Sequence, residues 1–240
     1  MKNFFKIFLL FSFLLLPFRF LQAQNLVPNP SFEQVSSGCP CYGSGIYFSH
    51  VFNWSIPNQL SPDLYTQCAD SYTSCTFAQT PQNSFGWQMP KQGFNYAGIA
   101  AGQDYVDYRE WIETKLIDTL IPSKNYCVNF YVSLADSSGL AISNIGVLFS
   151  DSLITDISHD SASPPWTPIF HYYPPNIENP HGNIITDTIN WTKIEGTYSP
   201  NSKKAYIVLG NFDKYTQIDT LRVSNKAVLG AQNFAYYYID

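Results

Sequence analysis

The sequence predicts an all-β domain, a sandwich or barrel, on three observations. Short runs rich in β-branched and aromatic residues recur along the chain, and turn-forming residues separate them. Aromatic side chains make up 17% of the 240 residues and charged side chains only 13%, and no segment has the spacing of an amphipathic helix. The 16 Pro and 13 Gly residues are spread along the chain without a linker-like block, so one large β-domain is expected.

The first 23 residues are typical of a secretory signal peptide. Lys2 and Lys6 form a basic start, an apolar run follows over residues 7–16, and the small Ala23 stands at the expected cleavage site. The apolar run is shorter than the roughly 20 residues that a membrane-spanning helix needs. We therefore expect residues 1–23 to be removed on export to the cell surface or medium. An uncleaved N-terminal anchor is the alternative.

Removal of the signal segment leaves an acidic chain. The whole sequence has 13 basic and 18 acidic residues, and Lys2, Lys6 and Arg19 are the basic ones within the signal segment, which holds no acidic residue. The formal charge of residues 24–240 is therefore −8. Such a surface repels phosphate backbones, which argues against nucleic acid as a partner. It is compatible with a bound cation or a neutral ligand.

The clearest predicted strand covers residues 126–135. Its side chains alternate with a period of two, which places one set in a core and the other on the opposite face. The core set is Tyr126, Val128, Phe130, Val132 and Leu134, and the opposite set is Cys127, Asn129, Tyr131, Ser133 and Ala135. Further strands are predicted at residues 25–32, 95–100, 109–116, 141–149, 191–198, 204–211 and 234–240. Residues 158–183, rich in Pro, Asn and His, are predicted to form a long surface loop.

Five cysteines occur, at positions 39, 41, 68, 75 and 127. In an exported chain the first four indicate two disulfides. We favour Cys39–Cys68 with Cys41–Cys75, and the pairing Cys39–Cys75 with Cys41–Cys68 stays open. Cys127 lies in a predicted strand and is expected to be a buried, unpaired thiol. A zinc site is disfavoured because Cys39 and Cys41 lack the usual two-residue spacer.

Two predicted strands offer a candidate ligand surface. Arg109, Trp111 and Glu113 share one face of the strand at 109–116, and Asn129 and Tyr131 lie on the non-core face of the strand at 126–135. If these strands are neighbours in one sheet, their side chains form an aromatic platform. Trp111 and Tyr131 would then stack on a sugar ring, and the other three would contact its hydroxyl groups. The alternative is that Trp111 packs under a loop.

A second group of aromatic residues lies in the predicted long loop. It comprises Trp166, His171, Tyr172 and Tyr173, which would contact a sugar or a protein, or would cover the end of a sandwich.

The sequence carries no motif of a known catalytic class. It lacks the Gly-x-Ser-x-Gly elbow, the His-Glu-x-x-His zinc motif and the phosphate-binding loop. Glu110 and Glu113 are three residues apart, which places them on opposite faces of a strand and argues against a glycosidase carboxylate pair. We therefore expect no intrinsic catalytic activity.

A series of short motifs follows the chain in a recognisable order. They are the opening Asn25-Leu-Val-Pro-Asn-Pro-Ser-Phe-Glu33, then Cys39-Pro40, Trp54, Ser61-Pro-Asp-Leu-Tyr65, Pro81-Gln-Asn83, Tyr96-Ala-Gly-Ile99, Tyr108-Arg-Glu-Trp-Ile112, Trp191, Gly210-Asn-Phe212 and the closing residues 236–240. In this order they resemble the N-terminal jelly-roll domain of secreted surface proteins of the Bacteroidota that are gliding-motility-associated or contain an OmpA domain. That domain is similar to galactose-binding-like, carbohydrate-binding β-sandwiches.

The resemblance covers nearly all of residues 24–240 and implies an architecture and a role. It implies a galactose-binding-like jelly-roll β-sandwich as the single domain of residues 24–240, in a protein that continues beyond Asp240. It also implies a surface adhesion module with a glycan or a cell-surface protein as partner. A structural or protein-interaction spacer of an envelope protein, and an accessory domain of a polysaccharide-degrading enzyme, are the alternatives. It further implies a structural Ca²⁺ held by Glu33 and Asp240, because carboxylate oxygens are ligands that calcium prefers.

Overall fold

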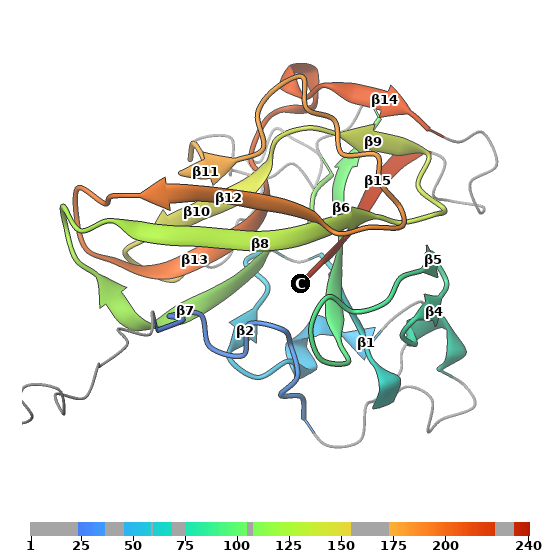
Figure 1. The fold of residues 1–240 in the computed structure, drawn as a ribbon, viewed down its shortest axis with the longest axis horizontal. Coiled ribbons are helices and arrows are strands. Elements are labelled where there is room, and N and C mark those ends of the chain that lie inside the picture. The colour runs from blue at the N-terminus through green and yellow to red at the C-terminus, as the bar shows by residue number, and fades with distance from the viewer. Residues whose placement is uncertain are drawn as a thin grey trace, which may run out of the picture.

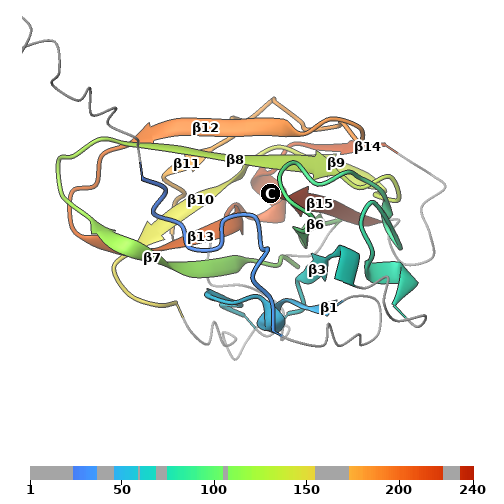
Figure 2. The same cartoon turned by 60° about the horizontal axis from the view of Figure 1, so that its bottom comes forward.

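A computed structural model describes residues 24–36, 46–58, 60–68, 75–104, 108–154, 173–223 and 233–240. Within these residues the chain forms two antiparallel sheets that pack face to face (Figures 1 and 2). One sheet has six strands, in the spatial order β1 (Ile46–Tyr47), β3 (Asp63–Tyr65), β6 (Tyr96–Gln103), β15 (Phe234–Ile239), β8 (Tyr126–Leu134) and β12 (Thr192–Tyr198). The other has five, in the order β11 (Ile177–Glu178), β10 (Ile145–Ser150), β13 (Lys204–Asn211), β7 (Ile112–Leu120) and β2 (Trp54–Ser55).

The strand order is that of a jelly roll. Eight strands in chain order, β6, β7, β8, β10, β11, β12, β13 and β15, form its two four-stranded layers. The first, eighth, third and sixth of them are neighbours in one sheet, and the fifth, fourth, seventh and second are neighbours in the other. This double Greek-key order defines the jelly roll among all-β sandwiches. The predicted fold class, an all-β jelly-roll sandwich, is therefore confirmed.

The interior of the sandwich follows the period-two pattern of the sequence. In β8, Phe130, Val132 and Leu134 are buried, whereas Cys127 and Asn129 are exposed. Side chains from both sheets join them in one core, including those of β13 and β15. Each such fully buried side chain contributes about 1.5–3 kcal/mol to folding relative to an exposed one.

The predicted strand at residues 25–32 is wrong. Asn29 and Phe32 have φ angles of 47° and 59°, which lie in the left-handed region, and no strand includes them. Pro28 and Pro30 also lack the N–H groups that a ladder requires. The segment is fixed by its side chain instead, because Asn29 Nδ2 donates to the carbonyl oxygens of Gln34 and Phe52, both at 3.0 Å.

Two other predicted strands have different limits. The one at 141–149 is divided into β9 (Leu140–Ile142) and β10, because Asn144 between them has a φ of 63°. The one at 109–116 begins only at Ile112 and runs on to Leu120. β9 pairs with β14 (Thr220–Arg222) in a small sheet outside the main layers.

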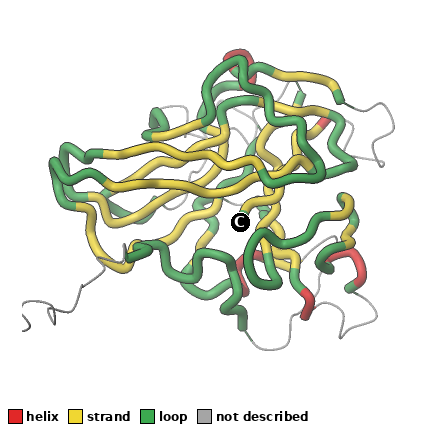
Figure 3. The backbone as a smooth tube through the Cα atoms, in the orientation of Figure 1, coloured by secondary structure: helices red, strands yellow, loops and turns green. Residues whose placement is uncertain are grey.

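Helical structure in the described part of the chain is limited to short 3-10 turns, shown in red in Figure 3. They include Phe48–His50, Thr76–Ala78 and Tyr215–Gln217. No helix of these residues has the length and apolar character required to cross a bilayer. The predicted signal segment, residues 1–23, lies outside the described residues.

The cysteines differ in part from expectation. Cys68 and Cys75 each belong to a disulfide. Cys39 and Cys41 lie outside the described residues, so the predicted connectivity stays a prediction. Cys127 carries a free thiol that is exposed, so its predicted burial is wrong. Cys127 lies near the start of β8, on the face opposite to Phe130. Side chains on both faces of this strand are buried only further along, from Val132 to Leu134.

Candidate functional site

The predicted aromatic platform does not form. β7 belongs to the five-stranded sheet and β8 to the six-stranded sheet, so Trp111 and Tyr131 come from opposite layers. Trp111, directly before β7, is fully buried, and its Nε1 donates to the Asn211 carbonyl oxygen at 3.0 Å. A ligand has no access to this ring, so the prediction that Trp111 stacks on a sugar is wrong.

Burial of Trp111 follows from the shape of β13. Gly210 in β13 has a φ of +155°, and a Cβ atom at this position would overlap the Trp111 ring. The indole packs there with Leu148 and Val208 on the outer face of the five-stranded sheet. Gly210 is therefore the residue that makes room for the indole in this layer.

Arg109 and Glu113 are also fully buried, so their predicted role as exposed polar contacts is wrong. Glu113 Oε1 accepts a hydrogen bond from the Ile154 amide at 3.0 Å, and Ile154 packs on the Trp111 cluster. Burial raises the pKa of Glu113 to about 7. The segment after β10 thus covers this face of the five-stranded sheet.

Asn129 and Tyr131 remain at the surface, on the outer face of β8. Asn129 is exposed and lies opposite Glu195, and Tyr131 lies opposite Lys193 of β12. The Lys91 ammonium stands 4.6 Å from the centre of the Tyr131 ring. This strip is polar and holds one aromatic ring, and it is separated from the other three residues of the predicted platform by the thickness of the sandwich.

The remainder of the outer face of the six-stranded sheet is occupied by a layer of tyrosines. Its buried members are Tyr65, Tyr96, Ala100, Ala135, Tyr236 and Tyr238. Above them lies the hairpin of β4 (Gln82–Asn83) and β5 (Gly86–Trp87), and Phe85 at its tip stacks on Tyr236 with 3.9 Å between centroids and 3° between planes. The hairpin is fixed from below, because Tyr238 donates to Asn83 at 2.8 Å. This face is therefore closed.

Two carboxyl groups lie within this closed layer. Asp63 Oδ2 accepts hydrogen bonds from the hydroxyls of Tyr236, at 2.6 Å, and Tyr65, at 3.5 Å. Glu110 accepts from the Ala100 amide at 2.8 Å and from the Ser61 amide at 3.2 Å. Burial raises the pKa of Asp63 to about 6, and burial with the nearby Asp63 charge raises the pKa of Glu110 to about 8. The layer therefore favours a neutral Glu110 at neutral pH.

A pocket of about 500 Å³ opens at one end of the sandwich, where β10 and β12 end and β13 begins. Phe149 and Tyr198 form a stacked ring pair there, with 4.8 Å between centroids and 5° between planes. Tyr173 adds a ring that is 49% exposed. The other lining residues are Leu148, Ser150, Asp151, Pro174, Asn176, Ser199, Asn201 and Lys204. The pocket thus combines aromatic rings with amide, hydroxyl and charged groups.

The pocket residues are positioned by backbone contacts. The Phe149 amide donates to Asn176 Oδ1 at 2.7 Å, and the Asn176 amide donates to the Val147 carbonyl at 2.8 Å. These bonds fasten the segment at Tyr173–Asn176 to the edge of β10. Tyr173 belongs to the second group of aromatic residues that the sequence indicated, whereas Trp166, His171 and Tyr172 lie outside the described residues.

Glu33 and Asp240 lie at one loop, residues 91–95. Glu33 Oε1 accepts from the amides of Phe94 and Asn95 at 2.8 and 2.9 Å, and Asp240 Oδ2 accepts from those of Lys91 and Gln92, both at 2.9 Å. We call this arrangement the carboxylate clasp. Burial, together with the charge of Glu33, raises the pKa of Asp240 to about 6.

The clasp has some of the chemistry that a calcium site needs. Two carboxylates that repel each other in a partly buried position favour a nearby cation. Among the described residues, however, no three His, Cys, Asp or Glu side chains are grouped to hold a metal ion. A calcium ion at the clasp would therefore take its remaining ligands from carbonyl oxygens, hydroxyls or water.

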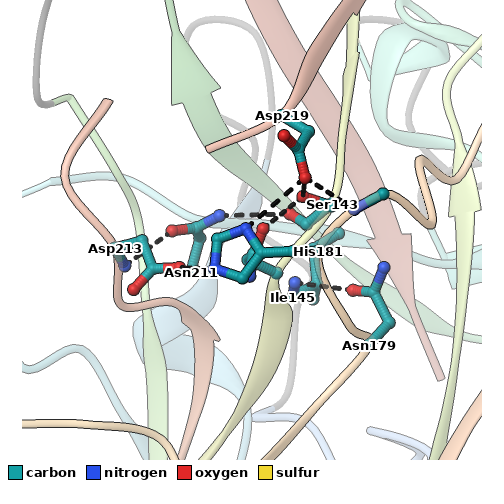
Figure 4. Close-up of polar contacts among 9 residues, drawn as sticks. Ser143, Ile145, Asn179, His181, Asn211, Asp213 and Asp219 are labelled. Carbon is teal, nitrogen blue, oxygen red and sulfur yellow. Dashed lines mark hydrogen bonds and ion pairs between the residues drawn. The ribbon is translucent and has the colours of Figure 1, made fainter. Parts of the chain in front are cut away.

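A serine, a histidine and two aspartates meet where the loops after β9, β11 and β13 converge (Figure 4). Asp219 Oδ2 is the hub: it accepts from Ser143 Oγ at 3.2 Å and the Gly182 amide at 2.6 Å, and lies 3.4 Å from His181 Nδ1. A hydrolytic triad needs the imidazole between the nucleophile and the acid. Here the carboxylate is between them, so the cluster joins three loops and does not have triad geometry.

No protein-family model and no curated protein matches this chain. Among solved structures, it is similar to the CBM22-1–GH10 modules of endo-1,4-β-D-xylanase 10B from Clostridium thermocellum complexed with xylohexaose, with a TM-score of 0.36 and 10% identity over 78% of this chain and 25% of that one. The chain thus spans about a quarter of that structure. A likeness of this extent assigns no function, and the fold assignment above depends on strand order.

Proposed function

We propose that this chain is an exported, non-catalytic binding module that takes a glycan in the end pocket. The observation that carries the proposal is the pocket itself, where the exposed ring of Tyr173 stands beside the Phe149–Tyr198 pair and the side chains of Asn176 and Asn201. Sugar rings stack their C–H faces on aromatic rings, while amides bind their hydroxyls. The order of sequence motifs, which resembles surface domains of the Bacteroidota, supports the same role.

The other surfaces support this choice of site. The outer face of the six-stranded sheet is closed by the β4–β5 hairpin, and the face that carries Trp111 is covered after β10. In the pocket, the exposed Tyr173 and the half-buried Tyr198 lie with polar groups around one space, and Phe149 behind Tyr198 belongs to the core. A lectin-like role for this module therefore predicts binding at the end of the sandwich.

A polysaccharide panel tests the proposal. The exported chain is titrated with soluble polysaccharides by affinity electrophoresis and calorimetry, and the binders are then tested on two variants. Tyr173→Ala removes the exposed ring and is expected to weaken binding roughly two- to tenfold, because an aromatic stacking contact contributes about 0.5–1.5 kcal/mol. Tyr131→Ala, on the distant strip of β8, is the matched control and is expected to bind normally. Equal binding by both variants would exclude this pocket.

A protein-interaction role is the second candidate, and one surface favours it. Trp87, Met89 and Ile189 are exposed large apolar side chains, and Trp191 Nε1 donates to the Met89 carbonyl oxygen at 2.8 Å, which brings two of the segments together. Exposed apolar groups of this kind often mark protein contacts. A chain that binds no polysaccharide but loses a protein partner on Trp87→Ser would fit a spacer or assembly domain of an envelope protein. An accessory role beside a polysaccharide-degrading domain is compatible with the glycan proposal.

Calcium at the carboxylate clasp is a further part of the proposal. It is supported by the meeting of Glu33 and Asp240 at one loop, as the resemblance implies. Thermal unfolding with calcium and with a chelator tests it, with Glu33→Gln as the variant. Calcium is expected to raise the Tm of the wild type and to leave that of the variant unchanged. An equal response of both proteins would place any calcium elsewhere.

A further inference from the structure

The end of the sandwich that holds the pocket differs in charge from the rest of the domain. Residues 24–240 hold ten basic and 18 acidic side chains. At the pocket end, Lys204 lines the pocket and Lys203 precedes it. Lys124 lies at the same end of the sandwich, because the Ser123 amide of the turn between β7 and β8 donates to the Pro200 carbonyl at 2.9 Å. Its ammonium is 5.5 Å from the centre of the Tyr126 ring and outside the pocket lining. These lysines are the pocket-end lysines.

The opposing charges at this end are fewer. Asp151 lines the pocket and Asp118 lies near the end of β7, both exposed. Among the described residues none of the pocket-end lysines belongs to an ion pair, whereas Lys193 is paired with Glu195 and Arg222 with Asp104. An unpaired ammonium beside a pocket has no charge partner to give up when an anion binds.

The rings and amides of the pocket suit a sugar ring and its hydroxyl groups, and the ammonium of Lys204 suits a negatively charged substituent on that sugar. Lys204 is half-buried and lines the pocket wall, whereas Lys203, its neighbour in the chain, is exposed and outside the lining. A neutral glycan would leave the attraction of these groups unused. A carboxylated or sulfated one would gain a charge-assisted hydrogen bond at the wall and a weaker, salt-screened attraction to Lys203.

We propose that the pocket takes an anionic glycan, one that carries carboxylate or sulfate groups, with Lys204 as the main charge contact. This inference rests on the proposed glycan-binding function and specifies its ligand class. An anionic ligand differs from the cation or neutral ligand with which the net charge of the whole domain is compatible. The net charge describes the whole surface, whereas binding depends on the charges within about a Debye length of the pocket.

Polymer pairs that differ only in charge test the inference. The full exported chain is titrated at low ionic strength with polygalacturonate and its methyl ester, with alginate and its propylene glycol ester, and with dextran sulfate and dextran. At least one anionic member is expected to bind more tightly than its neutral partner, and to lose affinity as sodium chloride is raised from about 50 to about 300 mM. Lys204→Gln is expected to weaken that binding roughly two- to fivefold, the range for one partly screened ion pair.

Lys193→Gln is the control, because Lys193 is an exposed lysine paired with Glu195 on another part of β12. Binding of a neutral polymer with no preference for any charged partner would overturn this inference and leave the glycan proposal intact. Absence of binding to every polymer would overturn both. Equal losses for Lys193→Gln and Lys204→Gln would show general polyanion attraction and would overturn the assignment to the pocket.

Discussion

Replacement of Glu110 by Gln is expected to stabilise the protein at neutral and higher pH. Glu110 lies against the closed tyrosine layer, where it accepts hydrogen bonds from the Ala100 amide and the Tyr108 hydroxyl. Burial, with the nearby Asp63 charge, raises its pKa from 4.5 to about 8. Between these two values the unfolded chain releases a proton that the folded chain keeps, so stability falls as pH rises. In the Glu110→Gln variant this position has no proton to release in either state.

The size of the effect follows from the pKa difference. Each unit is worth about 1.4 kcal/mol, so at about pH 7.5 a neutral Glu110 costs about 4 kcal/mol relative to a non-titrating group. The two oxygens of Glu110 accept amide hydrogen bonds from Ala100 and Ser61, and a Gln side chain keeps one of them. Loss of the other costs about 1 kcal/mol. The expected net gain in the free energy of unfolding is therefore about 3 kcal/mol at about pH 7.5.

Urea unfolding between about pH 5 and about pH 8.5 provides the assay. The pKa values of Asp63 and Asp240 are raised to about 6, so their contributions to the slope are nearly complete by about pH 7. Glu113, with a pKa of about 7, still adds roughly a few tenths of a kcal/mol above pH 7, equally in both proteins. Between about pH 7 and about pH 8 the wild type should lose about 1 kcal/mol, whereas Glu110→Gln should lose little. A difference between the two proteins that stays constant with pH would refute the reasoning.

Two other predictions concern packing and accessibility. Gly210→Ala should destabilise the domain by about 3 kcal/mol or more, because its Cβ would overlap the Trp111 ring. Gly102→Ala is the control and should cost little, because its Cβ would lie 3.5 Å from Ile142 Cδ1. Equal midpoints of urea unfolding for the two variants would contradict this prediction. Cys127 should react with a maleimide in the native protein, with the label assigned to Cys127 by peptide mass spectrometry and no change in Tm. Labelling of Cys127 only after unfolding would show that the thiol is buried.

The strands that the sequence revealed are those in which one face is buried and the other is not. In β8 the burial of Phe130 and Val132, with exposure of Asn129, repeats the alternation of the sequence. Residues 25–32 have the composition of a strand, but Asn29 and Phe32 adopt left-handed backbone conformations that composition does not report. Propensity measures an average preference, and here local hydrogen bonds of Asn29 outweigh it.

The predicted site was wrong for a topological reason. Alternation assigns a side chain to a face of its own strand, but it does not say which sheet the strand joins. In this jelly roll most consecutive strands, such as β7 and β8, go to opposite layers, with β10 and β11 as the exception. Trp111 and Tyr131 were therefore separated by the same order of strands that confirmed the fold.

The pocket was not predictable from spacing, because Phe149 and Tyr198 lie far apart in sequence. Phe149 belongs to β10 of one sheet and Tyr198 to β12 of the other, and their rings stack where the two sheets meet. Tyr173 was the one signal for it, as an aromatic residue in a polar loop. The meeting of Glu33 and Asp240 at one loop came from the family resemblance, and no periodic pattern links positions so distant.

The position of β15 has a consequence for biogenesis. The last strand of the domain lies between β6 and β8, and pairs with both. Until residues 234–239 are in place, the six-stranded sheet is two separate pieces with unsatisfied inner edges. The sheet can therefore close only after residues 234–239 have been synthesised, and residues 24–233 cannot complete it on their own. If the chain is exported as we propose, this strand order keeps the domain open until its last strand is made, and an open chain is the form that a secretion channel can thread.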